Sequence, residues 1–352
     1  MVSKNIKGIN RIRGCLIGGA AGDALGFPIE FLSEKEIFDS FGADGITEYS
    51  LNPYTGTALI SDDTQMTLFT AQGIIEAFDE IGDKRYDKTI RQHIAGCYQE
   101  WLYTQGMVFN RKKNRECSWL CGIPDLFDRR YPGNTCLSAL EIRSNSALRD
   151  DYISDKINNS CGCGGVMRVA PIGFIPCNYI PVIDMEAAQA AAITHSHSLG
   201  FIPAALLAHI IHRSVYPVTG LNTLEEIVDE SIYTVRELFK DDENIDKQIK
   251  MLKTAIALSE NSNSDLDNIH VLGEGWVGDE ALNIAVYCAL KHKDDFSAGL
   301  IASVNHKGDS DSTGAIFGNI LGAYLGIGAI EDKWKNKLEL NRVIMMVADS
   351  FK

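Results

Sequence analysis

Residues 11–27 read RIRGCLIGGAAGDALGF and form the first strong helical pattern of the chain. The pattern contains an unusual number of small residues, namely Gly14, Gly18, Gly19, Ala20, Ala21 and Gly22. A glycine inside a helix costs about 1 kcal/mol relative to alanine, so this many glycines must be offset by tight packing or by backbone that approaches a ligand. The stretch therefore predicts a helix that neighbouring helices approach closely. Within it, Asp23 is expected to be an internal cap or a buried, hydrogen-bonded carboxylate.

Helical periodicity recurs along the rest of the chain, and no alternating strand pattern of any length is present. The expected helices cover residues 11–27, 62–81, 85–104, 135–142, 185–193, about 200–212, 221–239, 245–259, 315–328 and 332–351, with another buried helix within 271–290. Residues 105–160 are otherwise rich in turn formers and are expected to be mostly loop. No Pro-rich, low-complexity or charged linker divides the chain. The sequence therefore predicts an all-α fold, a compact single-domain helical bundle over residues 1–352.

The composition narrows the class of protein further. With 352 residues and 45% apolar content, the chain can bury a substantial core. Its formal net charge of −14 argues against a nucleic-acid or anionic-membrane partner, because both require clustered Lys and Arg. Nine scattered cysteines favour free thiols in a reducing cytoplasm. The basic N-terminal residues before the first apolar run resemble a signal peptide, but Asp23 interrupts that run, so the segment is expected to be mature protein.

Two short acidic motifs each open a predicted helix. Ser61-Asp62-Asp63-Thr64 begins the helix at 62–81, and residues 305–315, NHKGDSDSTGA, place Asp309 and Asp311 two residues apart on a Gly-flanked turn. Either motif alone is an ordinary cap or turn. If both meet at one point, their carboxylates repel one another unless a cation lies between them. Carboxylate and hydroxyl oxygens select magnesium or manganese over zinc.

The segments SDDTQMTLFTAQGI (61–74) and NHKGDSDSTGAIFGNILGAYLG (305–326) resemble, in spacing and order, the paired metal motifs of the ADP-ribosylglycohydrolase family. The resemblance covers about residues 11–330 and implies the all-α fold of that family. It also implies two Mg²⁺ or Mn²⁺ ions. Their implied ligands are Ser61, Asp62, Asp63, Asp309, Asp311 and Ser312.

Other parts of the resemblance imply a substrate site. Residues 161–171, CGCGGVMRVAP, resemble the family's Gly-rich segment whose backbone amides contact ADP-ribose, which implies contacts from Gly162, Cys163 and Gly164. Many relatives have Asn or Ser where this chain has cysteines, and a lone Cys-x-Cys is expected to be structural rather than a metal site. The Thr-His motif matches at His195, which resembles a residue that contacts the distal ribose or the phosphates. Trp276 is expected to be either core or a stacking platform for adenine.

The implied activity is hydrolysis of the N-glycosidic bond between ADP-ribose and a modified arginine side chain. Asp62 and Asp63 are the expected bases, and Glu30 matches a glutamate that in some family members reaches over the metals. The implied partners are arginine-modified proteins as substrates and ADP-ribose as product, with immunity against an ADP-ribosylating toxin as one role. The motif pair resembles arginine-specific members more than serine-specific ones.

Two alternatives remain open at this point. One is hydrolysis of serine-linked ADP-ribose or of a free ADP-ribose derivative. The other is a non-catalytic binding or structural member of the family. Oxygen side chains at all six metal-ligand positions weigh against this second alternative.

Overall fold

The computed structural model describes residues 2–81, 89–107, 117–144 and 146–352. These residues contain no strand, only the isolated bridges Ala58–Leu338 and Gly162–Val277, so the all-α prediction is confirmed. The helices are α1 (Val2–Gly26), α2 (Glu34–Phe41), α3 (Asp62–Ile81), α4 (Thr89–Thr104), α5 (Asn134–Ser144), α6 (Ile180–Ala192), α7 (Ser198–Val215), α8 (Leu224–Leu238), α9 (Ile245–Ser259), α10 (Asp265–Leu272), α11 (Gly278–Lys291), α12 (Phe296–Val304), α13 (Ser310–Leu325), α14 (Asp332–Asn336) and α15 (Asn341–Asp349).

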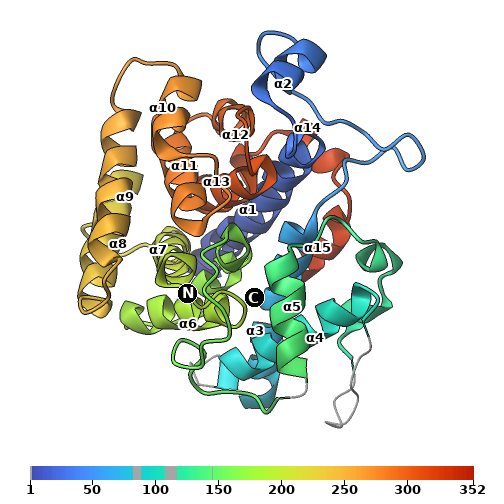
Figure 1. The fold of residues 1–352 in the computed structure, drawn as a ribbon, viewed down its shortest axis with the longest axis vertical. Coiled ribbons are helices and arrows are strands. Elements are labelled where there is room, and N and C mark those ends of the chain that lie inside the picture. The colour runs from blue at the N-terminus through green and yellow to red at the C-terminus, as the bar shows by residue number, and fades with distance from the viewer. Residues whose placement is uncertain (1, 82–88, 108–116, 145) are drawn as a thin grey trace.

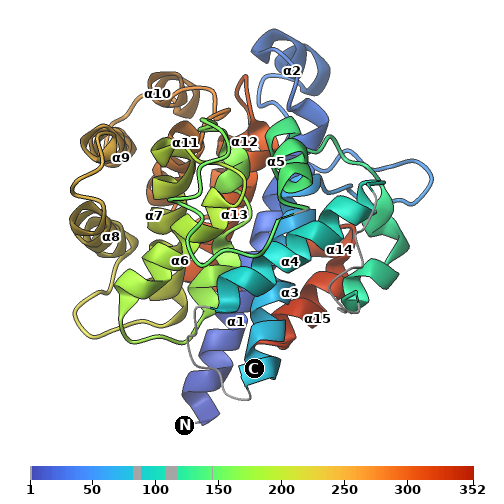
Figure 2. The same ribbon diagram turned by 60° about the horizontal axis from the view of Figure 1, so that its bottom comes forward.

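Helix α1 runs through the middle of the molecule (Figure 1). In Figure 2, α3, α4 and α15 lie on one side of it, and α6 to α9 lie on the other with α11 and α13. The buried apolar side chains of both sides form one continuous core. Among the described residues, α7 is long and apolar enough to cross a membrane, but 94% of it is buried inside the fold. It is therefore the core helix of this bundle.

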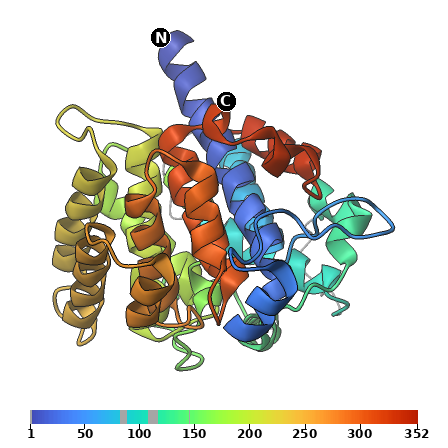
Figure 3. The ribbon, with the colours of Figure 1, turned by 90° about the horizontal axis from the view of Figure 1, so that it is seen from above.

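Helices α1 and α13 lie side by side (Figure 3). Glycines form the contact between them. A Cβ atom on Gly18 would lie 2.3 Å from the carbonyl oxygen of Gly318, and one on Gly22 would lie 1.9 Å from that of Gly314. Gly14 meets Gly322 in the same way. Because the contacting glycines recur at every fourth position on both helices, the antiparallel backbones touch along several turns. The close helix approach expected from residues 11–27 is thus present.

The structure departs from the predicted helices in several places. The helix expected over 332–351 is two helices, because Leu340 adopts a left-handed backbone conformation with φ of 55° and breaks it. The last long helix begins at Ser310 rather than at Ala315. Helices α2, α10 and α12 were not predicted, since eight or nine residues give little periodicity. Residues 85–88 of the expected helix 85–104 lie outside the described residues.

We expect Gly18→Ala and Gly318→Ala to destabilise the protein by about 1–3 kcal/mol or more, because each added methyl group meets opposing backbone that has no room to yield. Gly8→Ala is the matched control in the same helix. Nothing lies within 4 Å of a Cβ atom at that position, so alanine there should be neutral or stabilise by up to about 1 kcal/mol. Chemical denaturation measures all three variants. Equal effects at Gly8 and Gly18 would contradict the glycine contact.

Candidate active site

The C-terminal end of α1 holds the first turns of two other helices in place. The carboxylate of Asp23 accepts hydrogen bonds from the backbone N–H groups of Ser61, at 2.8 Å, and of Thr64, at 3.0 Å. Asp23 thereby satisfies amides at the start of α3, where no intrahelical acceptor is available. One turn further along α1, Gly26 packs on the backbone of Ser310 at the start of α13. Both acidic motifs therefore meet beside α1.

The carboxylates of these motifs are buried and close together. Oxygen atoms of Glu30, Asp309 and Asp311 all lie within 4.8 Å of one another. Burial, followed by the charges of Asp311 and Asp23, raises the pKa of Asp63 well above its ordinary value. The pKa of Asp311 is raised in the same direction by burial and by Asp309. At neutral pH the cluster of carboxylates is therefore stabilised by binding protons or cations.

Burial and the same cluster of carboxylates raise the pKa values of Glu30 and Asp23. Burial, with the charges of Asp311, Asp309 and Asp62, raises the pKa of Glu30 to about 10. Burial and Asp311 raise the pKa of Asp23 to about 7, although hydrogen bonds from Thr64 and Ser61 act in the opposite direction. A carboxyl group that retains its proton at neutral pH can serve as a general acid.

The arrangement fits hard divalent cations. The Oδ2 atom of Asp63 is buried and has no hydrogen-bond partner among the described residues, which is costly for a carboxylate unless a ligand takes it. The Asp62 carboxylate accepts a hydrogen bond from the N–H of Gly133 at 3.2 Å. The hydroxyl of Ser61 accepts the N–H of Asp63, also at 3.2 Å. Carboxylate and hydroxyl oxygens are the donors that Mg²⁺ and Mn²⁺ prefer.

The Gly-rich segment forms a wall beside this centre. It pairs with residues 276–278 through hydrogen bonds from Cys163 N–H to the Trp276 carbonyl and from Gly278 N–H to the Cys161 carbonyl, at 3.1 and 2.8 Å. The thiol of Cys163 then donates to Asp309 Oδ2 at 2.6 Å. The wall and the acidic cluster therefore touch.

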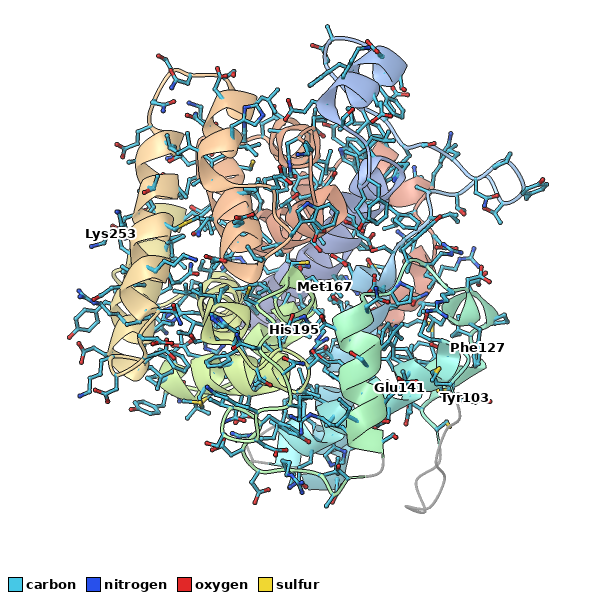
Figure 4. All side chains as sticks on the ribbon, in the orientation of Figure 1. Tyr103, Phe127, Glu141, Met167, His195 and Lys253 are labelled. Atoms are coloured by element: carbon cyan, nitrogen blue, oxygen red, sulfur yellow. The ribbon has the colours of Figure 1, made fainter. Side chains whose placement is uncertain are left out.

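His195 lies against the Gly-rich segment, and Figure 4 shows it with Met167 near the centre of the view, while Lys253 lies at the rim. A Cβ atom on Gly164 would lie 3.0 Å from the His195 ring. The ring Nδ1 contacts the hydroxyl of Thr194 at 2.8 Å, and burial together with the Arg168 charge lowers the pKa of His195 to about 3. The imidazole is therefore neutral, and it packs against the Gly-rich segment.

Phe31, Tyr131 and Trp276 are exposed aromatic side chains, and Phe31 contacts the other two. Trp276 is 39% exposed and stacks on Phe31 with ring centroids 5.9 Å apart, so the alternative that Trp276 belongs to the core is wrong. Phe31 also contacts Tyr131 at 5.9 Å. Behind Phe31 and Tyr131 lies a groove of about 490 Å³ that reaches Pro28 and Pro53. An exposed aromatic surface of this kind can stack a planar ring.

Comparison with known proteins decides the family. The model of the family described as ADP-ribosylglycohydrolase matches residues 4–352. The chain belongs to the ADP-ribosylglycohydrolase family. It is 26% identical over 369 residues to "ADP-ribosylhydrolase ARH3" of Mus musculus, covering 95% of this chain and 88% of that protein. It is 22% identical over 340 residues to "ADP-ribosyl-[dinitrogen reductase] glycohydrolase" of Rhodospirillum rubrum, covering 94% and 91%.

A solved structure titled "ADP-ribosylglycohydrolase-related protein complex" shares the fold of this chain, with a TM-score of 0.65, 21% identity and 98% of both chains covered. The structure brings the following sequence-predicted residues to the acidic centre and its wall: Ser61, Asp62, Asp63, Asp309, Asp311, Ser312, Glu30, Gly162, Cys163, Gly164, His195 and Trp276. The hydroxyl of Ser312 points toward Cys163 Sγ, at 3.5 Å, and Met167 Sδ, at 3.9 Å.

Three contacts were not predicted from the sequence. They are the Gly133 amide on Asp62, the Cys163 thiol on Asp309 and the contact of Trp276 with Phe31. Gly133 lies in a Pro-Gly-Asn turn, and this turn was the only sequence feature that pointed to the contact of its amide with Asp62. Cys163 lies in the Gly-rich segment 161–171, and its place in that segment was the only signal for the second contact. Phe31 directly follows Glu30, so its place in the chain was the only hint of the third.

The Glu30→Gln variant tests the electrostatics of the centre through pH. In the wild-type protein the folded-state pKa of Glu30, about 10, exceeds its ordinary value of 4.5, so stability is lost as pH rises between these two values. Glutamine does not titrate, so the variant has no such loss of stability from this position. In the presence of a chelator, the melting temperature of Glu30→Gln should exceed that of wild type by a margin that grows from about pH 5 to about pH 9. A margin independent of pH would show that burial and the aspartates do not raise the pKa of Glu30.

Proposed function

We propose that the protein removes ADP-ribose from arginine side chains of proteins by metal-dependent hydrolysis of the N-glycosidic bond. The observation that carries the proposal is the convergence of four buried aspartates, two from each helix start, beside a Gly-rich wall. The proposed ligands are Ser61, Asp62, Asp63, Asp309, Asp311 and Ser312. Two Mg²⁺ or Mn²⁺ ions bound there would supply polarisation of the ribose hydroxyls and acidification of a water molecule.

The protein's own groups have distinct proposed roles. Asp63 presents a buried carboxylate oxygen with no partner among the described residues, which suits the base that receives a proton from water. Asp62 is oriented by the Gly133 amide. Glu30 lies beside the centre, with a carboxyl oxygen within 4.8 Å of those of Asp309 and Asp311. The Cys163 N–H is already bonded to the Trp276 carbonyl, so the diphosphate would lie against other atoms of the Gly-rich segment, and the exposed Trp276 would bind the adenine.

Charge and leaving-group chemistry support arginine as the linkage. Cleavage passes through an oxocarbenium-like transition state, so a leaving group that already carries positive charge departs readily. The guanidinium group is such a leaving group. A protein with a formal net charge of −14 also attracts basic, arginine-rich surfaces at moderate salt. Release of arginine-bound ADP-ribose would in addition suit immunity against a toxin that modifies arginine.

A second candidate is hydrolysis of serine-linked ADP-ribose or of a free ADP-ribose derivative. The position of Glu30 favours it, because its carboxyl oxygen lies within 4.8 Å of those of Asp309 and Asp311 and its pKa is raised. An alkoxide leaving group is a strong base and needs a proton donor, so a protonated carboxyl at this point would serve an O-glycosidic substrate well.

Paired substrates separate these candidates. Two peptides of the same sequence context, one modified on arginine and one on serine, should be assayed for ADP-ribose release with Mg²⁺ and with a chelator. We expect release from the arginine peptide to be faster by about tenfold or more, and to stop in chelator. Faster release from the serine peptide would select the second candidate. No release from either peptide, or from free ADP-ribose derivatives, would contradict the hydrolase proposal.

Single substitutions at the centre provide a separate test. Asp62→Ala and Asp309→Ala should abolish hydrolysis and weaken Mg²⁺ binding by about tenfold or more, while far-ultraviolet circular dichroism remains that of wild type. Asp44→Ala removes an exposed aspartate outside the centre and should change neither property. Calorimetric titration measures the binding. Full turnover in Asp309→Ala with Mg²⁺ would contradict the ligand assignment.

A further inference from the structure

Arg168 is a fully buried cation, and no described carboxylate pairs with it. Its guanidinium lies over the ring of Tyr98, 4.4 Å from the centroid, and Nη1 lies 3.3 Å from Cys136 Sγ. Nη2 donates to the Ala190 carbonyl at 3.3 Å and to the Thr194 hydroxyl at 2.6 Å. Burying a cation away from an opposite charge is costly, so the groups that accept its N–H bonds hold it in place. The shortest of the bonds to oxygen is the one to Thr194.

The bond from Arg168 fixes the role of the Thr194 hydroxyl. A guanidinium has N–H donors and no acceptor, so the hydroxyl oxygen accepts from Nη2. Its single proton is then directed to another neighbour, and His195 Nδ1 lies 2.8 Å away. The thiol of Cys136 also lies near this hydroxyl, but sulfur is a weak acceptor. The Thr194 hydroxyl therefore donates to Nδ1, which carries a lone pair and no proton.

The other ring nitrogen of His195 faces the Gly-rich segment. Burial and the Arg168 charge lower the pKa of His195 to about 3, so the ring has one proton at neutral pH. With Nδ1 as acceptor, that proton lies on Nε2. A Cβ atom on Gly162 would lie 3.3 Å from Nε2, and one on Gly164 would lie 3.4 Å from it. Glycine at both positions therefore leaves an N–H donor without a covering side chain.

We propose that Arg168 is a positioning residue, which through Thr194 fixes the His195 proton on Nε2 for donation to an anionic oxygen held against the Gly-rich segment. Because Arg168 is fully buried, it acts through these two side chains and does not touch the ligand. The fixed tautomer follows from the hydrogen bonds alone. That the acceptor is a phosphate oxygen of the ADP-ribose diphosphate rests on the proposed function.

Nitrogen-15 NMR of the histidine rings in the full chain tests the tautomer without an activity measurement. The His195→Gln variant identifies the His195 signals by their loss. We expect the wild-type ring to carry its proton on Nε2, with Nδ1 at the chemical shift of a nitrogen that accepts a hydrogen bond. Thr194→Val and Arg168→Met should move the Nδ1 signal to that of a nitrogen without such a bond, whereas Thr194→Ser retains the wild-type signal.

Calorimetric titration with ADP-ribose in the presence of Mg²⁺ tests the contact with the ligand. Thr194→Val should weaken binding by about tenfold or more, and Thr194→Ser should bind as wild type does. Thr104→Val is the matched control, because it removes another buried threonine hydroxyl, which donates to the Trp101 carbonyl at 2.7 Å. It should change neither the His195 signals nor the affinity.

The outcomes separate this inference from the proposed function. A wild-type proton on Nδ1 would overturn the inference and leave the proposed function standing. Unchanged ADP-ribose affinity in Thr194→Val, with the Nδ1 bond lost, would overturn the contact between His195 and the diphosphate. If wild type keeps the Nε2 proton but binds no ADP-ribose, the proposed function and that contact fail, and the role of Arg168 in fixing the tautomer stands.

Discussion

The backbone contact between α1 and α13 is the constraint on which the rest of the structure depends. Two helices can approach so closely only where neither has a side chain, and the glycines of α1 and α13 meet this condition over several turns. Asp23 follows Gly22 directly, and Asp309 and Asp311 flank Ser310, which packs on Gly26. The helix contact therefore sets the distance between the carboxylates as well as the packing of the core.

The same contact brings buried carboxylates close together, and their electrostatic repulsion lowers the stability of the fold. Desolvation raises the pKa of Asp62, Asp63 and Asp311, and neighbouring carboxylates add to the effect. Such a cluster is unfavourable for stability, since each buried charge loses hydration and repels its neighbours. Bound divalent cations would turn this unfavourable contribution of the cluster to stability into a favourable one. They would stabilise the folded state by mass action. In the proposed metal centre, stability and metal binding would therefore be coupled through one group of side chains.

Sequence reasoning predicted the elements whose evidence is local. Periodicity gave α3 and α9 with their observed limits, and the adjacent acids at 62 and 63 and the pair at 309 and 311 indicated a shared site. Tertiary contacts were harder to predict. The position of Cys163 depends on pairing of its segment with residue 276, more than one hundred residues away. The break at Leu340 depends on a left-handed conformation for which leucine has no preference.

The most direct test of the central claim is a crystal of the protein grown with Mn²⁺ and measured for anomalous scattering. With the proposed metal centre, we expect anomalous peaks between the Asp62–Asp63 pair and the Asp309–Asp311 pair. Manganese bound elsewhere while these four carboxylates bind none would contradict the claim that the α1–α13 contact builds a metal centre.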